Sequence, residues 1–175
     1  MSEGLAFRAS LKTNPSDIPA RYYLGLCLLR QDQYREALEL FQNVPRSRDR
    51  AEQPPVPSQY QIQIALAQAH LGLKQYDEAW ENLESAKTLA PRSPEVYVCQ
   101  GRYYLEREKY QEAIQELEKA ISIDENNAEA YYYEGLAYYG AGMPESAVTA
   151  LKKFLQLAPY APEAGKAREI IAKLC

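Results

Sequence analysis

Apolar residues recur along this chain at helical spacing, in segments separated by short polar breaks. In one segment Tyr97, Gly101 and Tyr104 fall at positions i, i+4 and i+7, which lie on one face of an α-helix. The following segment, centred on Leu117, has the same spacing. The polar stretch 106–109 between them is long enough only for a tight antiparallel turn. Because no segment has the alternation of a β-strand, the pattern predicts an all-α chain of paired helices.

The helix pairs repeat along the sequence. A Tyr-Xaa-Glu-Ala segment begins at Tyr34, Tyr76 and Tyr110, and an altered fourth copy begins at Pro144. Successive copies are 34 residues apart, except that the first step is 42 because eight extra residues lie there. Other columns keep the same spacing, including one of small residues: Gly25, Ala67, Gly101 and Gly135. We expect these small residues where the two helices of a pair approach closely.

These columns resemble the tetratricopeptide repeat (TPR) family, which has an aromatic, Leu-Gly and an aromatic in its first helix and Ala, Leu or Phe, Ala and Pro around its second. The clearest copy carries Tyr131, Gly135, Tyr138, Ala147, Leu151 and Pro159. The resemblance covers nearly the whole chain. It implies an all-α, right-handed superhelical solenoid of antiparallel helix pairs with a C-terminal capping helix.

The repeat spacing divides the chain into segments. They are 1–17, the second helix of a partial repeat; 18–51, the first full repeat; 52–59, a Pro-rich insertion; 60–93, 94–127 and 128–161, the second to fourth repeats; and 162–175, the capping helix. The capping helix is amphipathic and is expected to cover the apolar face of the last repeat. There we expect the large Phe154 to face the small Gly165.

The N-terminal end begins with half a repeat, whose apolar side carries Leu5, Phe7 and Leu11. We expect an open face there. The chain is then either the last part of a longer repeat array or a protein whose open end is covered, for example by a second copy of itself.

The family resemblance implies that the first helices of the repeats line a concave groove that binds an extended peptide or a helix. The groove positions carry Tyr22, Leu26, Ile64, Gln68, Leu71, Val98, Arg102, Leu105, Tyr132, Leu136 and Tyr139. This lining is mostly apolar and aromatic, which suits an amphipathic helix or a hydrophobic peptide of a partner protein. The alternative interpretation is that these side chains serve packing alone.

Chaperone-binding members of the family hold a C-terminal carboxylate with a clamp of Lys, Asn and Arg on successive first helices. The matching positions here are Tyr22, Leu26, Ala65, Glu95 and Cys99, without Lys or Arg. One repeat later the set also lacks a cation and includes an acid. The sequence therefore predicts that the carboxylate clamp is absent.

Composition narrows the function further. The chain has 20 Lys and Arg against 24 Asp and Glu, with no basic cluster, which argues against a nucleic-acid partner. The only histidine, His70, lies in an interior packing column, and Cys27 and Cys99 have no second histidine for a nucleophilic pair. We therefore expect no catalysis, metal or cofactor. With no apolar run long enough to span a membrane, the cytoplasm is the expected location, or the periplasm if an export segment precedes this sequence.

The stretch 46–57 combines three arginines with Pro54, Pro55 and Pro57. It is interpreted either as a projecting loop that contacts an acidic partner or, more simply, as a tolerated insertion in a surface turn. Two roles other than peptide binding stay open for the whole chain. One is an assembly module that oligomerises through the open N-terminal end, and the other is a regulatory C-terminal region of a larger protein.

Overall fold

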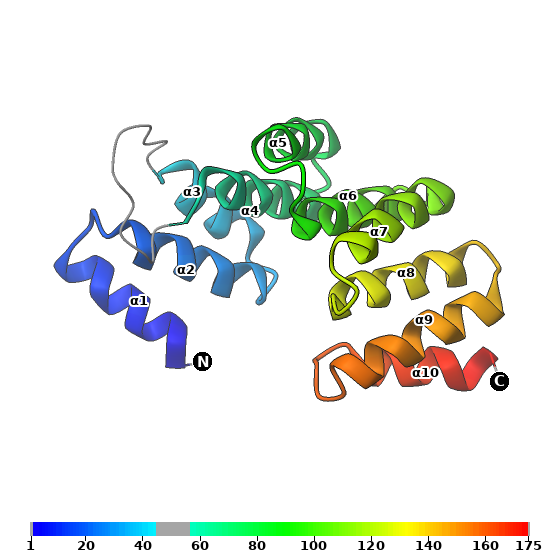
Figure 1. Ribbon diagram of the computed structural model, residues 1–175. Helices are drawn as coiled ribbons and strands as arrows, with labels where there is room; N and C mark the ends of the chain where they lie inside the picture. Colours follow the sequence, from blue (N-terminus) through cyan, green and yellow to red (C-terminus); the bar gives the residue numbers. More distant parts are fainter. Residues whose placement is uncertain (1, 45–56, 175) are drawn as a thin grey trace. The chain divides into compact units, whose positions relative to one another are not determined.

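The computed structural model describes residues 2–44 and 57–174, which form ten α-helices and no strand (Figure 1). The helices are α1 (Ser2–Thr13), α2 (Ile18–Leu29), α3 (Tyr34–Gln42), α4 (Gln59–Gly72), α5 (Tyr76–Leu89), α6 (Pro94–Glu106), α7 (Tyr110–Ile123), α8 (Ala128–Gly140), α9 (Pro144–Leu157) and α10 (Ala164–Leu174). The prediction of an all-α chain of paired helices is confirmed. Residues 52–56 of the predicted insertion 52–59 fall outside the described residues, whereas Ser58 caps α4 and Gln59 is its first residue.

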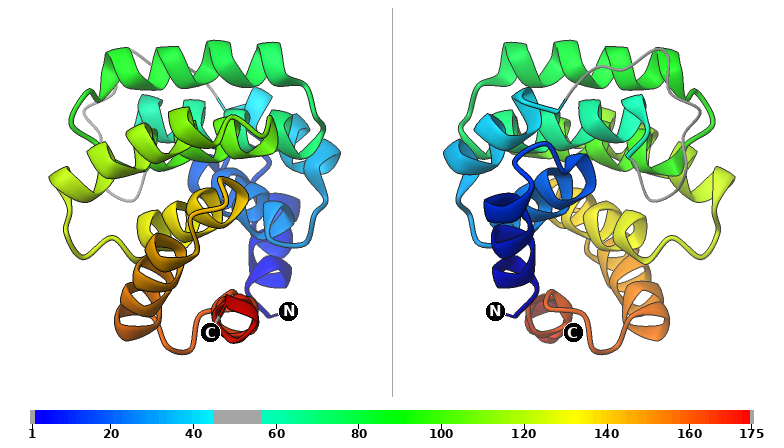
Figure 2. Two further views of the ribbon diagram at one scale, coloured as in Figure 1. Left: turned by 90° about the vertical axis from the view of Figure 1, so that its right-hand side faces the viewer. Right: turned by 90° about the vertical axis from the view of Figure 1, so that its left-hand side faces the viewer.

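The helices form two compact units, Met1–Ala90 with α1 to α5 and Pro91–Cys175 with α6 to α10. Inside each unit every helix packs on the next one along the chain, and α2 also contacts α4 as α6 contacts α8. Figure 2 shows the two helices of a repeat, such as α4 and α5, lying alongside each other. Consecutive pairs of this kind are the arrangement that the repeat spacing predicts.

Small residues allow close contact between the two helices of a repeat. A Cβ atom on Gly25 would lie 2.4 Å from a ring carbon of Phe41, and one on Gly135 would lie 2.6 Å from the Leu151 side chain. Gly101 has the same relation to Leu117, at 2.5 Å. These distances are far below van der Waals contact, so a larger side chain would push the helices apart. The predicted role of the small column is confirmed at all three glycines.

The turn between the two helices has the same backbone geometry in all four repeats. One residue per turn has a positive φ angle: 58° at Asp32, 59° at Lys74, 57° at Glu108 and 72° at Gly142. The amide of the next residue donates to a carbonyl five residues earlier, at 2.9 Å in each turn, as from Gln33 to Leu28. This is a Schellman motif, which usually places glycine at the left-handed position. Only the fourth repeat does so.

Two first helices begin with a side-chain cap. The carboxylate of Asp17 accepts a hydrogen bond from the amide of Ala20 at 2.9 Å, and the side chain of Asn127 accepts one from Ala130 at the same distance. Asp17 also accepts a hydrogen bond from the hydroxyl of Ser10 at 2.6 Å. The Ser10 and Ala20 bonds lower the pKa of Asp17, so its negative charge persists at the positive end of α2.

The capping helix covers the end of the last repeat with a different register from the one expected. Phe154 is 3% exposed and belongs to a core with Ala164, Ala167 and Ile170. Gly165 points elsewhere, because a Cβ atom added to it would contact nothing within 4 Å. The predicted pairing of Phe154 with Gly165 is wrong. Since α10 begins at Ala164, the two alanines supply the small surface that accommodates the phenyl ring.

The apolar side of α1 is largely covered within its own unit. The Phe7 ring stacks on Tyr23 with 5.7 Å between centroids, and Leu11 packs against the core beneath α2. Leu5 is 68% exposed. The expected open face of three residues is therefore corrected to Leu5 alone, because Phe7 and Leu11 lie on the side of α1 that packs on α2.

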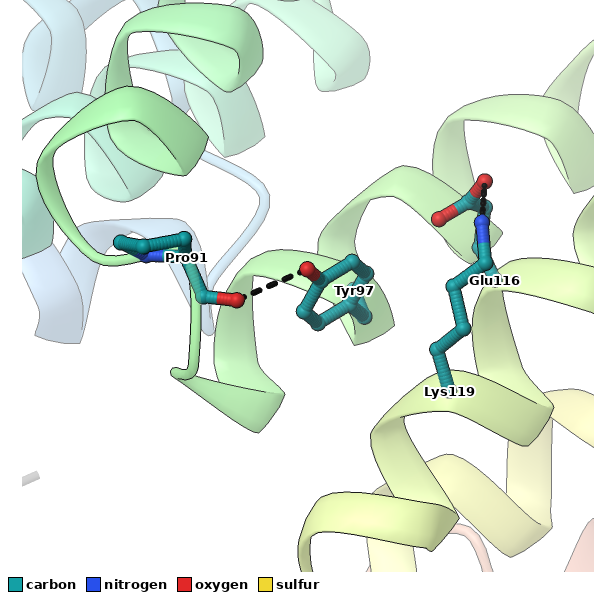
Figure 3. Close-up of polar contacts among 4 residues, drawn as sticks. All are labelled: Pro91, Tyr97, Glu116 and Lys119. Carbon is teal, nitrogen blue, oxygen red and sulfur yellow. Dashed lines mark hydrogen bonds and ion pairs between the residues drawn. The ribbon is translucent and has the colours of Figure 1, made fainter.

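Polar contacts join the start of α6 to the preceding loop and hold α7 together (Figure 3). The Tyr97 hydroxyl donates to the Pro91 carbonyl at 2.8 Å, and the Lys119 ammonium lies 2.7 Å from Glu116 Oε1. The side chain of Glu116 is only 13% exposed. The lysine compensates the charge of this half-buried carboxylate.

The single histidine and two of the cysteines differ in their burial. His70 is only half-buried, with its Nδ1 atom 2.9 Å from Gln75 Oε1 across the turn that follows α4, so the prediction of a buried histidine is wrong. Its column lies near the end of the helix, where the ring reaches solvent. Cys27 and Cys99 are buried free thiols.

Candidate functional site

The second unit contains a hollow of about 500 Å³ that brings together four of the predicted groove residues. We call it the Arg102 hollow. It is lined by Arg102, Leu105, Glu106, Glu108, Tyr110, Tyr132, Tyr133, Leu136, Glu163 and Lys166. The predicted members are Arg102 and Leu105 from α6 and Tyr132 and Leu136 from α8. Because Tyr110 begins α7 and Glu163 and Lys166 flank the start of α10, four helices and the loop before α10 contribute to the wall.

Arg102 is the central cation of this hollow. Its guanidinium carbon lies 5.1 Å from the centroid of the Tyr133 ring, a cation–π distance. Burial disfavours the charge of Arg102, but the electrostatic effects of Tyr133 and Cys99, which ionise only at high pH, and of Glu129 and Glu106 together outweigh burial and raise the pKa of the guanidinium. Burial also raises the pKa of the Tyr133 hydroxyl. Arg102 is therefore charged and Tyr133 neutral at physiological pH.

Carboxylates surround this cation on several sides. Desolvation raises the pKa of Glu129, and the attraction of Arg102 opposes this shift without cancelling it. Glu163 and Glu95 repel Glu129 and add to the increase. The hollow therefore combines two leucines and three tyrosines with two cations, Arg102 and Lys166, among acids. Such a lining can bury apolar side chains and position polar ones, but it offers no group paired for catalysis.

Other predicted groove residues lie inside the protein. Tyr22, Ile64, Val98 and Leu71 are 4–7% exposed. They belong to the hydrophobic interior, so they support the first helices and offer a partner almost no surface. A first helix in a solenoid is buried around much of its circumference. The residues that pack inside the protein and those that face the groove are both apolar, so the sequence did not distinguish them.

The remaining predicted residues differ in exposure. Leu26 and Gln68 on α2 and α4 are half-buried, and Tyr139 at the end of α8 is 43% exposed. The structure adds Tyr133, Glu163 and Lys166 to the surface, which the sequence reading missed. Tyr133 was recognisable as part of the run of tyrosines at 131–133, whereas Glu163 and Lys166 lie outside the repeat columns and gave no signal.

Sequence profiles of repeat families match most of the chain. A TPR repeat profile matches residues 101–142, and tetratricopeptide repeat profiles match 6–39 and 129–159. A profile of subunit 3 of the anaphase-promoting complex, cyclosome, matches 56–120. The chain belongs to the tetratricopeptide repeat family. No curated protein sequence matches the chain significantly.

Solved TPR structures resemble the chain over most of its length. The APC/C hetero-tetramer Cut9–Hcn1 matches with a TM-score of 0.77 and 19% identity, over 98% of this chain and 32% of that one. This chain thus spans about a third of that relative. TTC0263 of Thermus thermophilus matches with a TM-score of 0.73 and 22% identity, over 88% and 79% of the two chains. YrrB, described as a TPR protein with an unusual peptide-binding site, matches with 0.60 and 21%, over 93% and 80%. These likenesses establish the solenoid fold.

The TPR family consists of protein-interaction scaffolds, and the matched profiles indicate no enzyme family. Across residues 2–44 and 57–174 no three His, Cys, Asp or Glu side chains gather as a metal site. Within the same ranges no helix combines the length and apolar character needed to cross a membrane.

Proposed function

We propose that this TPR chain binds a partner polypeptide, either an amphipathic helix or a hydrophobic peptide, with the Arg102 hollow as the centre of the binding surface. The observation that carries the proposal is the convergence of Arg102, Leu105, Tyr132 and Leu136 on one hollow of about 500 Å³. These residues come from the first helices of two successive repeats. A ligand that lies across both helices would contact Arg102, Leu105 and Leu136, which are partly exposed, whereas Tyr132 is 6% exposed and supports the floor of the hollow.

The lining suits apolar anchors positioned by one arginine. Each leucine or phenylalanine side chain that a partner buries fully contributes about 1.5–3 kcal/mol from the removal of apolar surface from water. Tyrosine and arginine are the residues most often found at the energetic centres of protein interfaces. The guanidinium of Arg102, held against the Tyr133 ring, presents donors to a carbonyl or carboxylate of the ligand.

We also propose that the hollow binds without a chaperone-type carboxylate clamp. At the matching positions Ala65 and Cys99 are buried, and Glu95 is exposed with the wrong charge. In the hollow itself Glu106, Glu108 and Glu163 disfavour a second carboxylate. The peptide-binding site described for YrrB supports peptide recognition by a chain of this fold. We therefore expect ligands whose apolar side chains, rather than a free C-terminus, determine the affinity.

A library of helical peptides displayed on phage tests the proposal. Selection on the wild-type chain should enrich sequences with apolar residues at i, i+3, i+4 and i+7. The Leu136→Glu variant should bind the selected peptides at least tenfold more weakly, because it buries a charge among apolar anchors. Ile123→Glu is the matched control, since Ile123 is 43% exposed at the end of α7 and does not line the hollow. Equal binding by both variants would exclude the hollow as the site.

Oligomerisation through α1 is a second proposal, supported by the 68% exposure of Leu5. Light scattering at increasing concentration tests it. A dimer that Leu5→Glu abolishes would support assembly, and a monomer at all concentrations would contradict it. Phe7→Glu is not a suitable variant, because Phe7 packs on Tyr23 and its loss would damage the fold.

A further inference from the structure

A second hollow, of about 420 Å³, lies between α8 and α9. We call it the Glu134 hollow. One wall is formed by Tyr131, Glu134 and Tyr138 of α8, and the other includes Glu145, Ser146 and Thr149 of α9. It shares no lining residue with the Arg102 hollow. The groups on its walls are carboxylates, hydroxyls and aromatic rings, which accept or surround positive charge.

Glu134 is an unusual residue for this position. It is 9% exposed, yet within residues 2–44 and 57–174 no hydrogen bond or ion pair joins its carboxylate to another group. Burial, together with repulsion from Glu118, raises its pKa to about 7. An unpaired buried carboxylate is costly, and an opposite charge beside it would remove much of that cost.

The neighbours of Glu134 are mostly acidic or aromatic. Tyr131 and Tyr138 lie one helical turn before and after it on the same face of α8. Burial raises the pKa of both hydroxyls, and the charge of Glu134 adds to the increase. Glu118 on α7, Glu145 on α9 and the loop residues Asp124 and Glu125 add negative charge around these groups. Lys153 on α9 is a cation close to this wall, and its ammonium lies 5.9 Å from the Tyr131 ring centroid.

The first repeat has a hollow at the same register, 110 positions earlier in the chain, of about 440 Å³. We call it the Arg21 hollow. Leu24 and Leu28 stand in place of Glu134 and Tyr138, and Arg21 stands in place of Tyr131. Arg21 donates hydrogen bonds to the carbonyls of Asn43 and Pro15. The α1 residue Arg8, which corresponds to Glu118, lines the hollow and pairs with Glu36 at 3.7 Å.

The two hollows therefore differ in where their positive charge comes from. In the Arg21 hollow two arginines of the chain itself accompany the acids. In the Glu134 hollow the corresponding positions are tyrosine and glutamate, while a carboxylate is buried in the wall. We propose that the Glu134 hollow binds a cationic side chain, Arg or Lys, of a partner polypeptide, with Glu134 as its counter-ion and the Tyr131 and Tyr138 rings as its aromatic walls.

This site lies apart from the lining proposed for peptide anchors, so a partner can use it alone or in addition. A guanidinium in the hollow would be attracted by the carboxylate of Glu134, which is 9% exposed, through a charge-assisted hydrogen bond, and by the tyrosine rings through cation–π contacts. Glu145 and the hydroxyls of Ser146 and Thr149 provide further acceptors on the opposite wall.

Titration of the full chain with N-acetyl-arginine amide, followed by amide NMR shifts, tests the proposal. N-acetyl-citrulline amide is the matched ligand, because it has nearly the same shape without the charge. At about pH 8 we expect the arginine probe to shift the amides of 131–138 and 145–150 and the citrulline probe to bind at least tenfold more weakly. Glu134→Gln should also weaken arginine binding at least tenfold.

Glu81→Gln is the matched protein control, since it removes one exposed acid on α5 and leaves the hollow unchanged. It should bind the arginine probe like the wild type. Equal binding of the two probes, or equal binding by Glu134→Gln and the wild type when both have the same far-ultraviolet spectrum, would overturn the proposal. Leu136 does not line the Glu134 hollow, so Leu136→Glu should leave this titration unchanged while it weakens peptide binding. The failure of one proposal can therefore be distinguished from the failure of the other.

Discussion

The first and fourth repeats of this chain pack their two helices together in the same way, and we call the residues at this close contact the frame. The two repeats differ in the side chains that line the hollow between the helices. Both place a glycine against the large side chain of the second helix, Phe41 in one and Leu151 in the other. In the first repeat the hollow is lined by three leucines and contains two arginines of the chain itself. In the fourth it contains a buried glutamate between two tyrosines.

The difference shows which positions of the repeat form the frame and which are free to specialise. Glycine at positions 25 and 135 is imposed by interhelical distance, since no larger side chain fits there. The neighbouring positions, Leu24 and Glu134, face a hollow that accepts either an apolar or a charged group. The close packing of the two helices therefore depends on the first kind of position, while recognition can be built at the second.

The largest expected effect comes from removing the charge of the fourth hollow. The pKa of Glu134 is about 7 in the folded chain against the ordinary value of 4.5, so the folded state binds the proton more tightly. The carboxylate therefore lowers stability as pH rises from about 4.5 to about 7, and the penalty is complete above that range. Urea unfolding should show Glu134→Gln more stable than the wild type by about 3 kcal/mol near pH 8.5 and by less than about 1 kcal/mol near pH 5. A gain that does not change with pH would show that Glu134 is not charged and desolvated in the fold.

The frame positions should respond alike in both repeats. Gly25→Ala and Gly135→Ala should each destabilise the chain by about 2 kcal/mol, because the new methyl group overlaps Phe41 or Leu151. Thermal and urea unfolding measure the loss. Gly165→Ala is the control, since it meets no atom within 4 Å and should cause no loss. An unchanged free energy of unfolding for either Gly25→Ala or Gly135→Ala would contradict the inference that the two repeats pack their helices in the same way.

The turns offer a smaller test. Asp32 adopts the left-handed conformation at a cost that glycine does not have, whereas Gly142 already occupies the equivalent position. Asp32→Gly should stabilise the first repeat by about 1 kcal/mol and Gly142→Ala should destabilise the fourth by about the same amount. Opposite signs in urea unfolding are the expected result. Equal signs would mean that another contact of the substituted residue outweighs its backbone conformation.

The smallest effect is expected at the surface of the first hollow. Arg8 and Glu36 form an ion pair at 3.7 Å with about half of each side chain exposed. Arg8→Ala should therefore change the free energy of unfolding by about 0.5 kcal/mol or less at physiological salt. A loss above about 1 kcal/mol would show that Arg8 stabilises the chain by more than an exposed ion pair does. The first hollow would then differ from the fourth in the stability that its arginines contribute as well as in its charge.

The repeat frame was predictable because it is encoded at fixed columns. The glycines at 25, 101 and 135 recur beside apolar residues at helical spacing, which reveals the helix pairs without any structure. The capping register was not predictable, because it depends on where α10 begins after the loop that follows α9. The left-handed turn residues were also missed, since only Gly142 carries the composition expected of that conformation.

The candidate sites were only partly predictable. The family resemblance assigned Leu105 and Leu136 to a groove, and both line the Arg102 hollow, yet it placed Tyr22 and Val98 in the same groove although both are buried. The adjacent faces of a first helix are all apolar. Whether a face is buried or lines a groove therefore depends on which other helices pack against it. Glu134 had a visible signal, because the column Leu24, Leu66, Gln100, Glu134 becomes polar along the chain. Its burial and lack of a partner depend on three-dimensional contacts.

The pKa of Glu134, followed through its side-chain carboxyl carbon by NMR, tests most directly whether the fourth hollow holds an uncompensated charge. The resonance is assigned by its absence from Glu134→Gln. A value of about 7 that decreases when N-acetyl-arginine amide is added is the predicted result. A value near 4.5 that the probe leaves unchanged would contradict it, because the carboxylate would then already be solvated or paired within the chain.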